Sequence, residues 1–212
     1  MLKINTYPMT RKTDRDCELP NLLSFLREKK DTFESLLDVG AHYSAGYYAN
    51  DVRLYAKKYH GLDPVLDEVV DRIVDKYFVA DFLKQPLDFY DFVLCLSTIE
   101  HVGMYGVVYS DPFQKRDEFF EKLLKTATRY LWLSFPVGQA YTIPGEMSII
   151  PLEQCERWLE LVKNYKVTSG FFHSEGPQAG YPWELSTKEQ CYAQKYIDSV
   201  GNQSICILEI EK

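Results

Sequence analysis

The segment from Leu96 to Gly103, which reads LSTIEHVG, carries the side chains best suited to catalysis. A histidine side chain titrates near neutral pH, so His101 can act as a general base that takes a proton from a hydroxyl group. The alternative for His101 is a loop residue that hydrogen-bonds a backbone carbonyl. Glu100 could orient His101, contact a bound ligand, bind a metal ion or form a structural hydrogen bond. This segment is our first candidate for a catalytic centre.

Four short apolar runs each end in a polar side chain: Asp38, Asp63, Asp81 and Ser97. If these runs are parallel strands, their carboxyl ends meet at one edge of a sheet, where open α/β sheets bind ligands. An aspartate at a strand end can also serve only as a turn former or a helix cap. The regular succession of four such positions favours one shared binding crevice.

A glycine-bearing turn follows the first of these runs. Gly40 comes two residues after Asp38, and a helix is expected to begin near Tyr47. Glycine lets the backbone approach a ligand closely, and a helix N-terminus offers free N–H groups. The sequence of the turn lacks the P-loop lysine and the full GxGxxG pattern of dinucleotide-binding proteins. His42 lies in this loop, where it either contacts a ligand or fills space.

The elements that must position these residues alternate along the chain. Apolar periodicity predicts helices over 19–30, 47–59, 64–76, 112–127, 151–162 and 186–196. It predicts strands over 35–39, 59–63, 77–80, 90–97, 130–135, 166–172 and 204–210. This order indicates an α/β, Rossmann-like fold: a seven-stranded, mostly parallel sheet with helices on both faces and an antiparallel last strand. We assign residues 1–18 to an N-terminal arm and 19–212 to a single domain.

Composition excludes several classes of function. The net charge of −7 argues against a nucleic-acid partner, which would need a basic surface. No apolar run of the sequence reaches the ~18 residues needed to span a membrane. The five cysteines show no zinc-binding spacing, and the sequence shows no signal peptide. We therefore expect a cytoplasmic protein with reduced thiols.

Over residues 19–211 the chain resembles the class I S-adenosylmethionine-dependent methyltransferases. The resemblance is carried by Asp38-Val39-Gly40, by Asp63, by Asp81-Phe82 and by Tyr90-Asp91 ahead of an apolar run. It implies S-adenosylmethionine as cofactor, with Asp38, Gly40, His42 and Ser97 around it. It also implies that Asp63 binds the ribose hydroxyls, that Asp81 lies near the adenine amino group and that Phe82 covers the adenine. His42 and Ser44 stand where the family usually has glycines.

The SxxEH pattern ending at His101 is also similar to sugar methyltransferases of bacterial surface-glycan biosynthesis. Asp111-Pro112 and the run from Ser134 to Gly138 add to this narrower resemblance. It implies transfer of a methyl group to a hydroxyl of a sugar or glycan precursor, with His101 and Glu100 as catalytic residues. Some relatives bind a divalent ion through an ExxEH pattern. Ser97 takes the first position here, so we predict no metal.

Aromatic and histidine side chains are expected to rim the crevice and contact the acceptor. The candidates are Tyr105, Tyr141, His173 and Trp183, with Tyr109 and Tyr181 in the same loops. Aromatic residues that pack these loops onto the domain are the alternative. Two other functions remain open: a methyltransferase-like scaffold without turnover, and a nucleotide-dependent oxidoreductase or sugar-modifying enzyme on a similar sheet.

Overall fold

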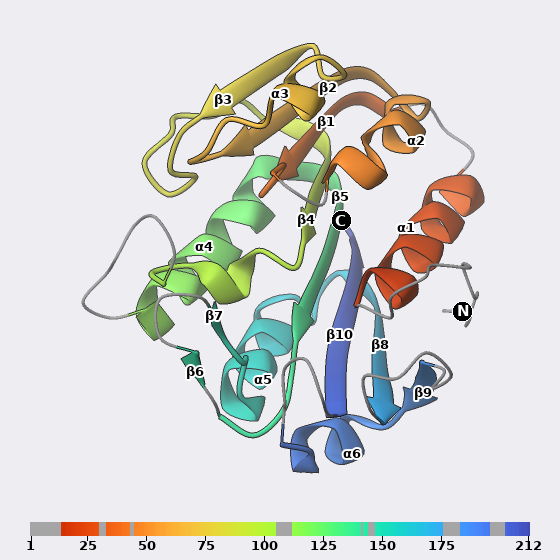
Figure 1. Cartoon of the computed structure of the whole chain (residues 1–212), viewed down its shortest axis with the longest axis vertical. Helices are drawn as coiled ribbons and strands as arrows, with labels where there is room; N and C mark the ends of the chain where they lie inside the picture. Colours follow the sequence, from red (N-terminus) through yellow and green to blue (C-terminus); the bar gives the residue numbers. More distant parts are fainter. Residues whose placement is uncertain are drawn as a thin grey trace.

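The computed structural model describes residues 14–29, 33–42, 45–104, 112–140, 142–143, 147–175, 183–195 and 202–212. Its centre is an eight-stranded sheet with the order β3-β2-β1-β4-β5-β10-β8-β9 (Figure 1). The strands are β1 (Phe33–Val39), β2 (Ala56–Asp63), β3 (Lys76–Val79), β4 (Tyr90–Leu96), β5 (Ala127–Pro136), β8 (Lys166–Glu175), β9 (Glu184–Ser186) and β10 (Asn202–Glu211). A separate two-stranded ribbon joins β6 (Thr142–Ile143) to β7 (Met147–Ser148).

The pairing confirms a largely parallel sheet whose last strand runs the other way. Neighbouring strands from β3 to β5 are parallel, and β10 is antiparallel to both β5 and β8. The predicted number of seven strands is too low, because β9 adds an antiparallel edge to β8. This strand is only three residues long, Glu-Leu-Ser, and is too short to show an alternating pattern.

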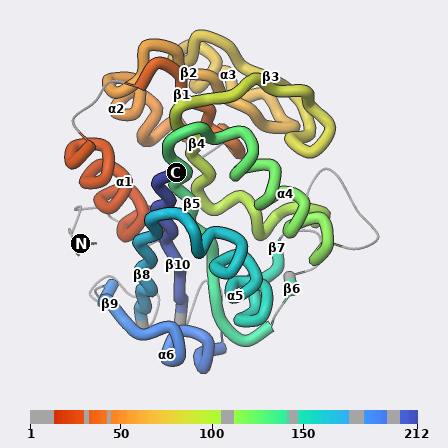
Figure 2. Tube along the Cα trace, turned by 180° about the vertical axis from the view of Figure 1, so that it is seen from behind, coloured from red at the N-terminus to blue at the C-terminus, as the bar shows by residue number. Residues whose placement is uncertain are grey.

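Helices cover both faces of the sheet, as predicted. Residues from α1 (Arg15–Lys29), α2 (Ala49–Arg53) and α3 (Glu68–Asp71) share one core cluster with Leu36, Phe92 and Leu94. Residues from α4 (Pro112–Thr126), α5 (Leu152–Leu161) and α6 (Lys188–Ala193) share the other with Leu37 and Val93 (Figure 2). Successive strand residues point to opposite faces, which is why the continuous apolar runs of β1 and β4 supply both cores.

Two predicted helices are much shorter in the structure. The helix expected over 47–59 is a single turn, η1 (Ala45–Tyr47), followed by α2, and strand β2 already begins at Ala56. Tyr59, which fitted the helical spacing, instead pairs with Leu36 of β1. The helix expected over 64–76 is reduced to α3, because Asp67 caps its start by accepting hydrogen bonds from the backbone N–H groups of residues 69 and 70.

The first helix starts earlier than predicted. It begins at Arg15, and both Cys17 and Glu18 are buried against the domain. The helix therefore begins four residues before its predicted start at residue 19, and Pro20 lies inside it. The first 13 residues of the predicted arm lie outside the described part of the chain.

Smaller differences concern caps and spans. Helix α6 is capped by Thr187 and Gln190 and begins at Lys188, two residues after its predicted start. Helix α4 begins at Pro112, as predicted, since proline is tolerated in the first helical position. None of the helices in the described ranges is long and apolar enough to cross a membrane.

Candidate active site

The turn after β1 can only be built with glycine. Gly40 has a positive φ of 85° and donates its N–H to the carbonyl of Leu62 at 2.8 Å. A Cβ at this position would lie 2.5 Å from Cγ2 and 2.7 Å from Cβ of Thr98, and closer still to Oγ1. The turn after β1 and the turn after β4 are therefore in direct contact at the carboxyl edge of the sheet.

Tyr77 of β3 supports this turn, a role that the sequence analysis missed. Its hydroxyl lies 2.8 Å from the carbonyl oxygen of Ala41 and 2.9 Å from that of Val65, so it bonds to the segments that follow β1 and β2. His42 follows directly, and its N–H bonds to the carbonyl of Gly40 at 2.8 Å. A tyrosine at a strand start gives no local signal of this long-range contact.

Asp38 is buried rather than exposed in the crevice. Its carboxyl accepts hydrogen bonds from the hydroxyls of Tyr48 at 3.2 Å and Tyr59 at 2.8 Å, and the residue has no accessible surface. Burial raises the pKa of Asp38 to about 7, while the two tyrosine hydroxyls act in the opposite direction. The carboxyl thus joins β1 to α2 and β2, directly beneath the glycine turn.

Asp63 and Asp81 lie where the sequence predicts, at the ends of β2 and β3. Asp63 Oδ1 accepts the N–H of Val65 at 2.8 Å, and Asp81 Oδ1 accepts that of Leu83 at 3.0 Å. Each acid therefore stabilises a turn with one of its oxygens. Burial raises the pKa of Asp63, and the charges of His42 and His101 lower it. The N–H groups of Gly40 and Ala41 both bond to the carbonyl of Leu62, so the end of β2 lies beside the turn after β1 at the same edge of the sheet.

Phe82 lies in the core. Its ring packs against Phe119 of α4 with centroids 4.7 Å apart, and the residue is only 3% exposed. The ammonium group of Lys122 lies 5.0 Å from the ring centroid and donates a hydrogen bond to the carbonyl of Phe82 at 2.5 Å. This packing leaves little of the ring to cover an adenine, so the contact implied by the resemblance stays a prediction.

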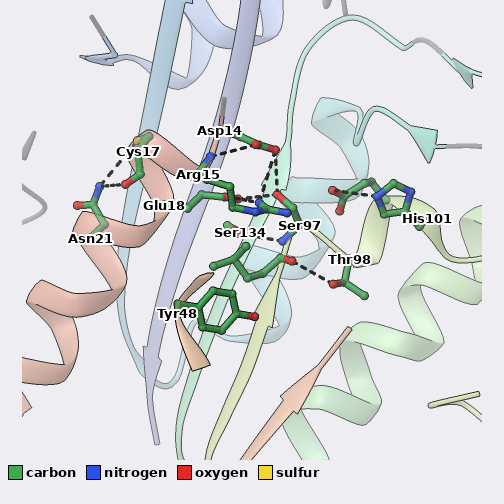
Figure 3. A network of polar contacts seen from close by, with 12 residues as sticks. Asp14, Arg15, Cys17, Glu18, Asn21, Tyr48, Ser97, Thr98, His101 and Ser134 are labelled. Carbon is green, nitrogen blue, oxygen red and sulfur yellow. Dashed lines mark hydrogen bonds and ion pairs between the residues drawn. The ribbon is translucent and has the colours of Figure 1, made fainter. Parts of the chain in front are cut away.

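Ser97, at the end of β4, is held by the first turn of α1 (Figure 3). Its hydroxyl donates to Glu18 Oε1 at 2.5 Å, and Arg15 forms an ion pair with the same glutamate. Among the described residues Ser97 is the one non-glycine with positive φ, at 41°. Such a backbone conformation costs of order 1–3 kcal/mol and persists only where surrounding contacts hold it. Asp14 completes the network, with its carboxylate 3.4 Å from the Ser97 hydroxyl.

Glu100 and His101 form the short helix η2 (Ile99–His101) that follows. Glu100 is buried, whereas 40% of the His101 side chain is exposed, and the Glu100 Oε1 to His101 Nε2 distance is 3.8 Å. Burial and the nearby charge of Glu18 raise the pKa of Glu100 to about 8. The glutamate is therefore mostly protonated at pH 7, and the accessible imidazole of His101 faces a neutral carboxyl group.

Of the predicted acceptor-binding residues, Trp183 and His173 lie in the described part of the chain. Trp183 is only 6% exposed and belongs to the core cluster that contains α1, so its contact with an acceptor stays a prediction. His173 lies on β8 and shares a hydrogen bond of 3.0 Å with Ser204 of β10. Tyr105 and Tyr141, like Tyr109 and Tyr181, lie outside the described residues.

The chain matches no protein-family model and no curated protein, but it shares its fold with solved structures. The sugar N-methyltransferase KedS8 from a Streptoalloteichus species has a TM-score of 0.53 and 12% identity, with 92% of this chain and 87% of that chain covered. A SAM-dependent methyltransferase from Archaeoglobus fulgidus has a TM-score of 0.52 and 14% identity, with coverages of 90% and 93%. A candidate RNA methyltransferase from Pyrococcus horikoshii has a TM-score of 0.52 and 12% identity, with coverages of 100% and 90%. The chain therefore has the Rossmann-like α/β fold of S-adenosylmethionine-dependent methyltransferases.

Proposed function

We propose that this protein is an S-adenosylmethionine-dependent methyltransferase that methylates a hydroxyl group of a sugar or glycan precursor. One observation carries the proposal. The glycine turn, Asp63 and the Ser97-to-His101 segment meet at the carboxyl edge of a sheet whose fold is that of methyltransferases. In open α/β sheets this edge is where ligands bind.

The residues at this edge fit the cofactor. Gly40 lets the turn after β1 pack directly against Thr98 of the turn after β4, and Asp63 would accept hydrogen bonds from ribose hydroxyls. S-adenosylmethionine carries a sulfonium cation and no pyrophosphate, so acidic side chains suit it better than a lysine or arginine clamp. When bound, it supplies an electrophilic methyl group to the acceptor oxygen.

His101 would remove the proton that the acceptor hydroxyl loses. The imidazole of His101 is accessible. The neighbouring Glu100 is mostly protonated at pH 7, so this carboxyl group carries little negative charge that would stabilise the protonated form of His101. General-base catalysis of this kind contributes ~10²–10⁴-fold to the rate. Glu100, with Oε1 3.8 Å from Nε2, limits the positions that the imidazole can take.

A sugar acceptor is favoured over a nucleic acid. The net charge of −7 opposes binding to a phosphate backbone, although one of the matching structures is a candidate RNA methyltransferase. Another matching structure is a sugar N-methyltransferase, which supports a sugar acceptor on this fold. The five cysteines are all buried free thiols, which supports a cytoplasmic location.

The test combines cofactor binding with turnover. Calorimetry should detect binding of S-adenosylhomocysteine, and a methyl-donor assay against nucleotide sugars and glycans should detect turnover. We expect His101→Ala to keep cofactor affinity and to lose about 10²-fold or more in kcat. His60→Gln is the control. It replaces a histidine of β2 that is hydrogen-bonded to Tyr90 of β4, and it should keep kcat.

Three results would contradict this proposal in different ways. Absence of cofactor binding at millimolar concentration would reject the cofactor and the activity together. Unchanged turnover of His101→Ala would reject the role of the base. Cofactor binding without turnover on any acceptor would favour the alternative, a cofactor-binding scaffold protein, for which His42 in place of a glycine is the motivating residue.

A further inference from the structure

Arg116 is a fully buried cation on the inward face of α4. It lies one turn before Phe119 and Phe120, and like them it faces the sheet. Its relative exposure is 0%, in a protein whose other arginines and lysines are mostly at the surface. Arginine is almost never fully buried unless it is paired, so this residue requires a physical reason.

The guanidinium of Arg116 has no hydrogen-bond partner within the described part of the chain. This holds for Nε, Nη1 and Nη2, all three of which are buried. One face of the guanidinium lies near the ring of Phe113, with Cζ 5.1 Å from the centroid. That contact leaves five in-plane N–H donors unsatisfied. Burying a cation without partners is strongly unfavourable, which indicates that a ligand supplies the acceptors.

The neighbouring acids do not supply them. Glu100 and Asp117 are the two acids whose charges act on Arg116. Asp117 Oδ1 already accepts from Trp158 Nε1 at 2.8 Å and from Gln154 Nε2 at 2.9 Å, and its Oδ2 accepts from Arg157 at 2.8 Å. Asp117 therefore serves α5 rather than Arg116. Glu100 Oε2 is itself buried and lacks a partner among the residues described.

The position of Arg116 links it to the candidate catalytic segment. Helix α4 follows β4 in the chain and begins at the carboxyl edge of the sheet, and its residues contact η2, which contains Glu100 and His101. Because Glu100 is mostly protonated at pH 7, its carboxyl group can donate a hydrogen bond. Arg116 interacts electrostatically with Glu100, and Glu100 in turn lies beside His101, the proposed base.

We propose that Arg116 and Glu100 form a subsite that binds an anionic group, a carboxylate or a phosphate, carried by the methyl acceptor. The inference rests on the proposed function and names the substrate class: an acidic or phosphorylated sugar. The planar guanidinium matches both oxyanions in a bidentate geometry. A neutral sugar would leave the buried charge uncompensated. Binding at this subsite holds the acceptor hydroxyl next to His101.

The experiment uses three matched sugars and the full-length chain. Glucuronic acid carries a carboxylate, glucose 6-phosphate carries a phosphate, and glucose carries neither. Affinities for the wild type, measured by calorimetry, should be about 10-fold to 100-fold higher for one of the two anionic sugars than for glucose. The sugar that binds more tightly distinguishes a carboxylate from a phosphate. Equal affinities for all three would overturn the proposal.

Arg116→Met tests the residue itself, and Arg72→Met is its control. Arg72 caps the C-terminus of α3 and its side chain is 79% exposed, so its replacement removes the same charge without touching the subsite. We expect Arg116→Met to lower the affinity for the anionic sugar about 10-fold to 100-fold and to leave that for glucose unchanged. Arg72→Met should leave both affinities unchanged. Unchanged anion affinity in Arg116→Met would reject the subsite.

Thermal unfolding separates a binding residue from a structural one. Since the guanidinium of Arg116 has no hydrogen-bond partner to lose among the described residues, Arg116→Met should melt at the same temperature as the wild type or higher. A large decrease in melting temperature would mean that the arginine stabilises the fold, and would overturn the proposal. Cofactor binding is measured separately: its absence would reject the proposed function, whereas the anion measurements need no cofactor.

Discussion

Replacing Gly40 by alanine should destabilise the protein through two separable effects. Residue 40 has φ of +85°, which a residue with a Cβ adopts at a cost of roughly 1–2 kcal/mol. The new Cβ would also lie 2.7 Å from Cβ of Thr98, and overpacking of this kind costs roughly 1–3 kcal/mol. The free energy of unfolding should therefore fall by about 2–5 kcal/mol.

A double-mutant cycle with Thr98→Gly isolates the steric part. Removing the Thr98 side chain eliminates the three atoms nearest to the new Cβ, but it leaves the strained φ unchanged. In the Thr98→Gly background, Gly40→Ala should cost only about 1–2 kcal/mol, so the coupling energy between the two positions is about 1–3 kcal/mol.

Urea unfolding followed by tryptophan fluorescence provides the measurement, because Trp132 and Trp158 are fully buried in the native protein. Thr98→Gly alone is the control for its own effect on stability. A cost of Gly40→Ala that is the same in both backgrounds would refute the reasoning. It would mean that the turns after β1 and β4 do not touch as the structure shows.

Three further predictions concern side chains that support the site. Ser97→Gly should be more stable than Ser97→Ala by roughly 1 kcal/mol in urea unfolding, because residue 97 has φ of +41°. At most positions the alanine variant is the more stable of the two, and that result here would argue against a strained backbone. The pKa of Asp38 is raised from 3.8 to about 7, so between these values the folded state keeps a proton that the unfolded state has lost. The free energy of unfolding should therefore fall with rising pH through this window, by up to roughly 4 kcal/mol, and Asp38→Asn should flatten that slope in unfolding curves recorded from pH 4 to 8. Tyr77→Phe removes the hydroxyl that bonds to the carbonyl of Ala41 and should cost about 1 kcal/mol of stability. It should also weaken the binding of S-adenosylhomocysteine, as measured by calorimetry. If stability and affinity are both unchanged, this hydroxyl does not support the turn.

The architecture could be predicted from local patterns. The apolar run of β4 indicates a strand buried on both faces, and the acids at the ends of β2 and β3 mark one edge of a parallel sheet. The glycine turn at position 40 and the candidate base His101 could likewise be chosen from nearby residue types, but the contact of Gly40 with Thr98 and the exposure of His101 come from the structure. Strand β9 was missed because its three residues are too few to show the alternation of apolar and polar side chains that indicates a strand.

Only the tertiary structure decided what each polar side chain contacts. The hydroxyl of Ser97 meets Glu18, 79 positions earlier in the sequence, because α1 packs its first turn over the end of β4. Asp38 is buried against the hydroxyls of two tyrosines, and the buried guanidinium of Arg116 has no hydrogen-bond partner in the described part of the chain, although its helix was predicted correctly. Residue types and spacing determine which elements form and which face is apolar. The partner of a buried charge depends on how distant elements pack together, and no local pattern carries that information.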